Sequence, residues 1–171
     1  MNRYLRCGLM NQIEMQCRFV IMAYEQLKIA SPVVEKFYAI HTLLTAAANV
    51  SKAAWGMGGT KSKYYSERDP LRQALSLTDD SPLYPLLDVR NGYEHYDQRL
   101  TDVIAENPRP FIVDSNVGPP DAVKMPNKIQ LRHFDDTTSD VHFLGYKLNL
   151  NDLVVEVQRI LPFAKTEAAK L

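Results

Sequence analysis

The side chains best suited to chemistry lie close together in the segment RNGYEH, which covers residues 90–95. Histidine side chains titrate near neutral pH, so His95 can both accept and donate a proton under physiological conditions. The guanidinium of Arg90 offers a planar set of donors that fits the oxygens of a phosphate group. Asn91 lies four residues before His95, which makes the two side chains neighbours on a helix. These residue types suit acid–base chemistry beside a phosphate.

One long helix is expected to carry this segment, from about Leu83 to Glu106. Its apolar residues recur at helical spacing and form one stripe: Leu86, Val89, Tyr93, Tyr96, Leu100 and Val103. Ser81 is the expected N-cap, and two prolines at positions 108 and 110 end the helix. The polar residues gather on roughly the opposite side: Asp88, Asn91, His95, Arg99 and Asp102.

The motif Arg90-Asn91-x-x-x-His95 resembles the Arg-polar-x-x-x-His motif of HEPN domains (higher eukaryotes and prokaryotes nucleotide-binding). The wider run SERDPLRQALSLTDDSPLYPLLDVRNGYEHYDQRL is also similar to a group of bacterial HEPN-like proteins. The resemblance covers roughly residues 11–106 and leaves the C-terminal third outside it. It implies a helical bundle that dimerises. In many family members such a bundle is a metal-independent endoribonuclease of toxin or defence type, often held in check by a separate antitoxin protein.

RNA cleavage needs a base for the 2′-hydroxyl, an acid for the leaving oxygen and a cation for the charge on the phosphate. The resemblance implies that His95 transfers protons, that Arg90 stabilises the phosphate and that Asn91 orients either of them. It implies neither a cofactor nor a metal ion.

Helix geometry predicts a dimer for this chemistry. Five residues advance a helix by about 500°, so Arg90 and His95 lie about 140° apart and are not direct neighbours. A two-fold pairing of this helix with its copy would gather two arginines and two histidines in a composite cleft, because a symmetric dimer contacts itself through one surface. Gly92 is compatible with such a close approach, although a mid-helix glycine costs about 1 kcal/mol relative to alanine. We therefore expect a homodimer and an inactive monomer.

Helices are also expected on both sides of this one. Residues 11–29 carry the apolar stripe Ile13, Cys17, Val20, Tyr24 and Leu27. A second helix follows Ser31 as N-cap and Pro32 as first position, with the stripe Val33, Phe37, Ile40, Leu44 and Ala47. A short helix is expected over residues 67–77. A closing helix capped near Asn151 would bury Leu153, Val157, Ile160 and Leu161.

Between the last two long helices the sequence changes character. Residues 111–128 are rich in proline and glycine and are expected to be irregular. A β-hairpin is expected after them, with KIQLRHF and DVHFLGYKLNL as its two arms and DDTTSD as its turn. The predicted fold class is mainly α. It is a HEPN-like helical bundle of about four helices plus a C-terminal helix, with a small C-terminal β-hairpin. One domain is expected over residues 1–171, with the bundle at 11–106 and the loop, hairpin and closing helix at 107–171.

The loop at residues 56–69 is a second candidate for contact with RNA. Lys61, Lys63, Tyr64 and Arg68 combine positive charge with stacking surfaces, and Arg99 on the polar face of the fourth helix adds a further cation. The alternative is a solvated loop whose tyrosines fold onto the bundle.

Two histidines in the hairpin raise the question of a metal site. A symmetric register would pair His133 with His142 and Asp135 with Asp140, and two histidines with carboxylates can hold zinc. Ile129, Leu131, Leu144 and Tyr146 share that face and are typical of core. The histidines are then expected at its solvent edge, and no metal site is expected.

Composition limits the remaining classes. Lys plus Arg equals Asp plus Glu, so the formal net charge is zero and any RNA contact must come from a local patch. Cys7 and Cys17 do not make a disulfide framework, and neither a signal peptide nor a membrane span is expected. A reducing cytoplasm is the expected compartment.

Three hypotheses follow. The first is a HEPN-like, metal-independent endoribonuclease of toxin or defence type, acting as a dimer, with an antitoxin protein as an expected partner. The second is a catalytically silent HEPN-like module that binds a partner or a nucleotide. The third, which the sequence favours least, is a small metalloenzyme built on the hairpin histidines.

Overall fold

The computed structural model describes residues 1–84, 86, 95–107, 109–120 and 124–170, and this part of the chain is mainly helical, as predicted. Its helices are α1 (Arg3–Ile29), α2 (Val33–Trp55), α3 (Asp69–Leu75), α5 (Tyr96–Glu106) and α6 (Leu150–Ala168). Two 3-10 turns, Gly59–Lys61 and Ser66–Arg68, lie between α2 and α3. Its strands are β1 (Phe111–Val113), β2 (Asn116–Val117), β3 (Lys128–Gln130), β4 (Arg132–Asp135), β5 (Asp140–Phe143) and β6 (Tyr146–Asn149).

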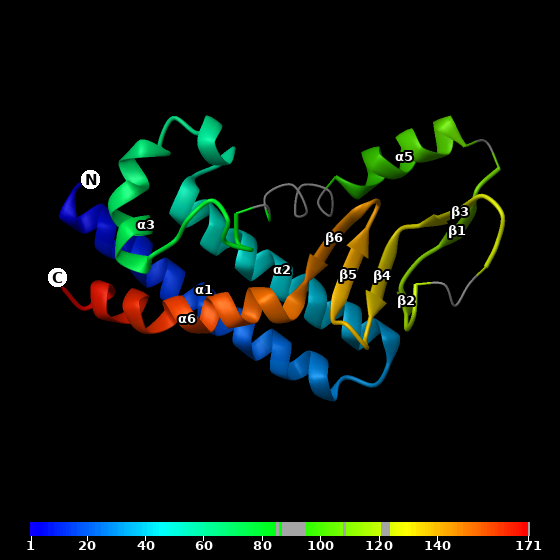
Figure 1. Ribbon diagram of the computed structural model, residues 1–171, viewed down its shortest axis with the longest axis horizontal. Coiled ribbons are helices and arrows are strands. Elements are labelled where there is room, and N and C mark those ends of the chain that lie inside the picture. Colours follow the sequence, from blue (N-terminus) through cyan, green and yellow to red (C-terminus); the bar gives the residue numbers. More distant parts are fainter. Residues whose placement is uncertain (85, 87–94, 108, 121–123, 171) are drawn as a thin grey trace.

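The long helices α1, α2 and α6 form the helical body, with α1 packed against both of the others (Figure 1). Ile13 and Cys17 of α1, Ile40 of α2 and Val157 of α6 are fully buried in one continuous core. All four belong to the predicted apolar stripes, so the three long helices are confirmed. α1 begins well before residue 11, because the side chain of Asn2 caps it by accepting a hydrogen bond from the Tyr4 amide at 2.8 Å.

The ends of α2 and α6 differ in detail from the sequence prediction. α2 begins at Val33, and its cap residue Pro32 makes no side-chain hydrogen bond, so Ser31 is not the N-cap. The helix ends at Gly56, which adopts a φ of 86° that favours glycine. The cap of α6 is Asn149, whose side chain accepts a hydrogen bond from the amide of the residue three positions later at 3.1 Å.

A four-stranded sheet in the order β2-β4-β5-β6 packs on the helical body. The register between β4 and β5 pairs His133 with His142 and Asp135 with Asp140, which confirms the predicted hairpin. Phe134, Val141 and Leu148 occupy neighbouring positions on one face and join the helical core. The sheet is therefore anchored by its own apolar face and not by the histidines.

Two predictions about this region are wrong. DVHFLGYKLNL forms two strands, because Leu144 and Gly145 both adopt positive φ angles and make a two-residue hairpin turn between β5 and β6. Residues 111–128 are not wholly irregular, since β1 pairs with β3 and β2 pairs with β4, both in parallel. These parallel pairs are two or three residues long, so they leave almost no alternation in the sequence.

The predicted fourth helix is not one uninterrupted element. Leu83 and Tyr84 lie in a turn, and His95 has a non-helical backbone (φ −104°, ψ 35°) directly before α5. A regular helix therefore does not begin at Leu83. The predicted end at Glu106 is confirmed. Within α5 no side chain is fully buried, so the part of the apolar stripe on this helix does not enter the core.

Candidate functional site

His95 is exposed and immediately precedes α5. Its carbonyl accepts a hydrogen bond from the Arg99 amide at 3.1 Å, which is the first helical bond of α5. Arg99 is also exposed, four residues after His95 in the sequence. Arg90 and Asn91 lie outside the described residues. The proposed proton-transfer residue is thus open to solvent with one cation close by in the sequence.

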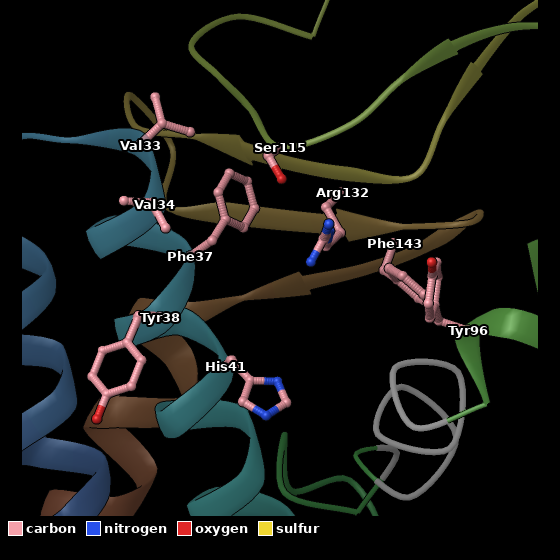
Figure 2. Close-up of a pocket in the computed structure, with 9 residues that line it drawn as sticks. All are labelled: Val33, Val34, Phe37, Tyr38, His41, Tyr96, Ser115, Arg132 and Phe143. Atoms are coloured by element: carbon pink, nitrogen blue, oxygen red, sulfur yellow. The ribbon is translucent and has the colours of Figure 1, made fainter.

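The residue after His95 lines a large open cleft. Tyr96 contributes one wall of this cleft, which has a volume of about 780 Å³ and lies between α2, the start of α5 and the sheet (Figure 2). The other lining residues come from α2 and from the segment around β4 and β5: Val33, Val34, Phe37, Tyr38, His41, Ser115, Arg132 and Phe143. A pocket of this size is in the range that binds small molecules or single nucleotides.

The cleft combines a largely aromatic lining with a few polar groups. Phe37 and Phe143 are buried and form apolar parts of its lining, whereas Tyr38 and Tyr96 are 62% and 48% exposed. His41 follows Phe37 by one helical turn, so both project from one face of α2 toward the cleft (Figure 2). Exposed aromatic rings of this kind can stack on a planar ligand.

Arg132 supplies the cation of this cleft. Its guanidinium binds the carboxylate of Asp114, with Nε 2.7 Å from Oδ1. Hydrogen bonding from Arg132 is the main reason why the pKa of the Asp114 carboxyl is lowered from its ordinary value. The ion pair fixes the guanidinium at the wall of the cleft, where Figure 2 shows it between Phe37 and Phe143.

The second predicted group, in the loop at residues 56–69, does not join His95. The loop leads into α3 at one end of the molecule, whereas α5 lies toward the other end (Figure 1). Lys61, Lys63 and Tyr64 are exposed, with Lys63 Nζ 4.8 Å from the centroid of the Tyr64 ring. Arg68 instead donates to the carbonyls of Lys52 and Ala53, where it caps the last turn of α2. Arg68 therefore has a structural task.

The hairpin histidines are paired as predicted, and His142 is half-buried, but His133 is not at a solvent edge. His133 is fully buried, and its strand β4 lies between β2 and β5. Its Nδ1 lies 3.1 Å from Nδ2 of the Asn116 side chain. Its Nε2 has no hydrogen-bond partner within the described part of the chain. Burial is the main reason why the pKa of His133 is lowered, followed by the nearby His142.

The carboxylates beside these histidines have other partners. Asp135 accepts a hydrogen bond from the Thr137 hydroxyl at 2.7 Å, and Asp140 pairs with the ammonium of Lys147 at 2.8 Å. Among the residues that the structure describes, no group of three or more histidine, cysteine, aspartate or glutamate side chains is placed to hold a metal ion. The third hypothesis, a metalloenzyme, gains no support from this geometry.

No protein-family model, curated protein or solved structure matches the chain. The resemblance to HEPN domains therefore depends on the motif at residues 90–95 and the run around it. None of the helices in the described ranges is long and apolar enough to cross a lipid bilayer.

The cleft itself was missed by the sequence prediction. Its residues come from five separate places in the chain, and no short-range pattern connects α2 with β4 or with Tyr96. On α2 the pattern was misleading, because Val33 belongs to the predicted core stripe and yet is 45% exposed at the cleft. His95 was identified from its chemistry, but its neighbourhood could not be.

Proposed function

We propose that this chain is a HEPN-like, metal-independent endoribonuclease, with His95 as the proton-transfer residue. The observation that carries the proposal is the position of His95. It is exposed and adjoins Tyr96, which lines the open cleft that also contains His41 and Arg132. An imidazole can move protons in RNA cleavage, a guanidinium can stabilise the charge on the phosphate, and aromatic rings can stack on the bases.

In this proposal the 2′-hydroxyl of the substrate attacks the adjacent phosphorus and the 5′-oxygen leaves. His95 moves the proton at one of these two oxygens, water exchanges the proton at the other, and Arg90 stabilises the charge on the phosphate. Asn91 orients one of these side chains. The products are a 2′,3′-cyclic phosphate and a free 5′-hydroxyl, which gives the reaction a recognisable signature.

The cleft would take an unpaired base of the substrate. Tyr38 and Tyr96 present exposed rings, and stacking of a base on an aromatic side chain contributes about 1–3 kcal/mol. Bases in a duplex are already stacked and cannot enter such a cleft. Single-stranded RNA is therefore the preferred substrate class, and the chain's zero net charge agrees with recognition through a local site and not through a broad basic surface.

Two partner expectations belong to the same proposal. One is a dimer in which residues 90–95 of two copies form a composite site, and the other is an antitoxin protein that covers His95. The alternative function is a catalytically silent interaction module, in which the same cleft binds a nucleotide or a partner without cleaving it.

The deciding experiment is cleavage of fluorescent single-stranded and duplex RNA in EDTA. Wild type is expected to cleave the single strand and to leave a cyclic phosphate. His95→Ala and Arg90→Ala should each lower the rate by a factor of about 100 or more. Gln98→Ala is the matched control, because Gln98 is also exposed on α5 and has no part in the proposed chemistry.

The binding role of the cleft is tested separately. Tyr38→Ala should raise the Kd for single-stranded RNA by roughly 5–150-fold, as expected for the loss of one stacked base. Phe163→Ala is its control, since Phe163 is a half-exposed aromatic residue on α6 away from the cleft. If wild type binds RNA tightly but does not cleave it, the silent binding module replaces the endoribonuclease. If wild type neither binds nor cleaves RNA, both proposed functions are wrong.

A further inference from the structure

α1 carries a second line of apolar side chains, in addition to the one that packs on α2 and α6. We call it the outer seam, and it consists of Leu5, Met15, Phe19, Met22 and Ile29. These side chains are between 42% and 84% exposed. Large apolar side chains gathered in one line on a helix are unusual for a surface that only meets water. The outer seam therefore indicates an interface.

The spacing of the outer seam identifies a helix as the partner. Its residues, together with Gly8, Gln12 and Gln26, follow one another at alternating steps of three and four over residues 5–29. This seven-residue repeat is the pattern by which one helix packs along another. None of the eight positions carries a charge. The partner must then present a long, uncharged apolar helix face.

Gly8 supports a close helix–helix contact. Glycine inside a helix costs about 1 kcal/mol relative to alanine. Among the described residues, a Cβ atom added at this position would contact nothing within 4 Å beyond its own stretch of helix, so their packing does not require a glycine there. The backbone of a neighbouring helix can approach closely at such a position.

We propose that a second copy of this chain covers the outer seam, with the two α1 helices antiparallel around a two-fold axis. A two-fold axis pairs one surface with itself, and the chain supplies a helix with the required face. The two ends of the seam are also complementary. Near the first end, Met1, Leu5, Leu9 and Tyr64, together with the charged Glu67 and Arg68, line a groove of about 320 Å³, while Ile29 at the other end is the most exposed residue of the seam, at 84%. Antiparallel pairing brings each Ile29 to the groove of the partner.

The size of the surface fits a dimer. The five apolar side chains of the seam expose roughly 500 Å², and the neighbouring Tyr4, Gly8 and glutamines bring the patch to about 800 Å² per copy, which is what each partner buries in an interface of standard size. The seam spans about 36 Å along the helix. α1 and α5 lie on opposite sides of α2 (Figure 1), and none of the outer-seam residues lines the cleft beside Tyr96. This interface differs from the dimer expected at residues 90–95 in the proposed function, so the two assemblies can be tested separately.

Sedimentation velocity over a range of protein concentrations tests the proposal. Wild type is expected to be a dimer. Phe19→Glu and Met22→Glu should each raise its dissociation constant about a hundredfold or more, because each would bury an unpaired carboxylate. Val155→Glu is the matched control, since Val155 on α6 is 64% exposed and Met22 is 66% exposed. A monomeric wild type, or a dimer that survives Phe19→Glu and Met22→Glu, would overturn the proposal. Circular dichroism shows that each variant is folded.

The antiparallel direction has its own test. Leu5→Lys and Ile29→Glu should each weaken the dimer, and the double variant should dimerise more tightly than either single variant. The two positions lie about 36 Å apart within one helix, so they can only attract each other between copies. If the double variant dimerises no more tightly than the single variant with the lower dimerisation affinity, the antiparallel arrangement is excluded.

Discussion

Asp79 connects the loop at residues 56–69 to the helical core, and its removal should destabilise the protein measurably. Its Oδ1 accepts a hydrogen bond from Nε1 of the fully buried Trp55 at 2.8 Å, and its Oδ2 accepts one from the hydroxyl of Tyr65 at 2.9 Å. A buried donor left without its partner costs about 1–3 kcal/mol. The Tyr65 hydroxyl is within reach of water and adds about 0.5–1 kcal/mol.

We therefore expect Asp79→Ala to lower the free energy of unfolding by about 2–3 kcal/mol, out of the 5–15 kcal/mol that is typical of a domain. Asp79→Asn keeps one oxygen acceptor and should cost less than about 1 kcal/mol. Trp55 is the single tryptophan of the chain, so its fluorescence during urea unfolding reports directly on the site.

Asp80→Ala is the control for this prediction, because Asp80 is the exposed neighbour of Asp79 and has the same charge. The reasoning would be refuted if Asp79→Ala and Asp80→Ala changed the free energy of unfolding equally. It would also be refuted if Asp79→Asn were as costly as Asp79→Ala, since the effect would then come from charge and not from the lost acceptor.

Three further predictions concern stability. The pKa of His133 is lowered in the folded state, chiefly by burial, so the unfolded chain binds more protons than the folded chain. The free energy of unfolding should therefore fall as the pH drops below about 6.5 toward the folded-state pKa, by at most about 1.4 kcal/mol per pH unit. His133→Leu should flatten this slope in urea titrations. Burial tends to raise the pKa of Asp140, but hydrogen bonds from Lys147, Asn149 and Thr138 outweigh it and lower that pKa to about 2. The contribution of Asp140 is therefore complete above about pH 3.9 and is lost as the pH falls through about 2, so Asp140→Asn should remove this low-pH transition. In the monomeric Met22→Glu background, Gly8→Ala should raise the free energy of unfolding by up to about 1 kcal/mol in thermal melts, and a destabilised variant would contradict the open surroundings of Gly8.

The helical body could be predicted from the sequence because its signals are local. Ile13, Cys17 and Val20 repeat with helical period, and the same residues are fully buried. The β4–β5 register could also be predicted, since a short polar turn fixes which residues face one another. The prediction failed at β5 and β6, where Leu144 takes a positive φ that a leucine seldom adopts.

The candidate site was only half predictable. His95 could be singled out because its chemistry is a property of one side chain and its motif. The cleft depends on long-range packing of α2 against the strands, and its residues have no common pattern in the sequence. Arg68 illustrates the opposite case, in which a residue type that suits phosphate instead caps the carbonyls of α2. Residue type alone does not separate these two uses of a guanidinium.

The two proposals give opposite expectations for a monomeric variant, and this makes the relation between assembly and activity testable. A composite site formed by residues 90–95 of two copies requires contact between those segments, so dissociation must abolish cleavage. A dimer through the outer seam keeps α5 away from the interface (Figure 1), so each cleft works alone. Phe19→Glu should then dissociate the dimer and leave the rate of RNA cleavage per chain unchanged within about twofold. Loss of cleavage together with dissociation would favour the composite site, because Phe19 does not line the cleft.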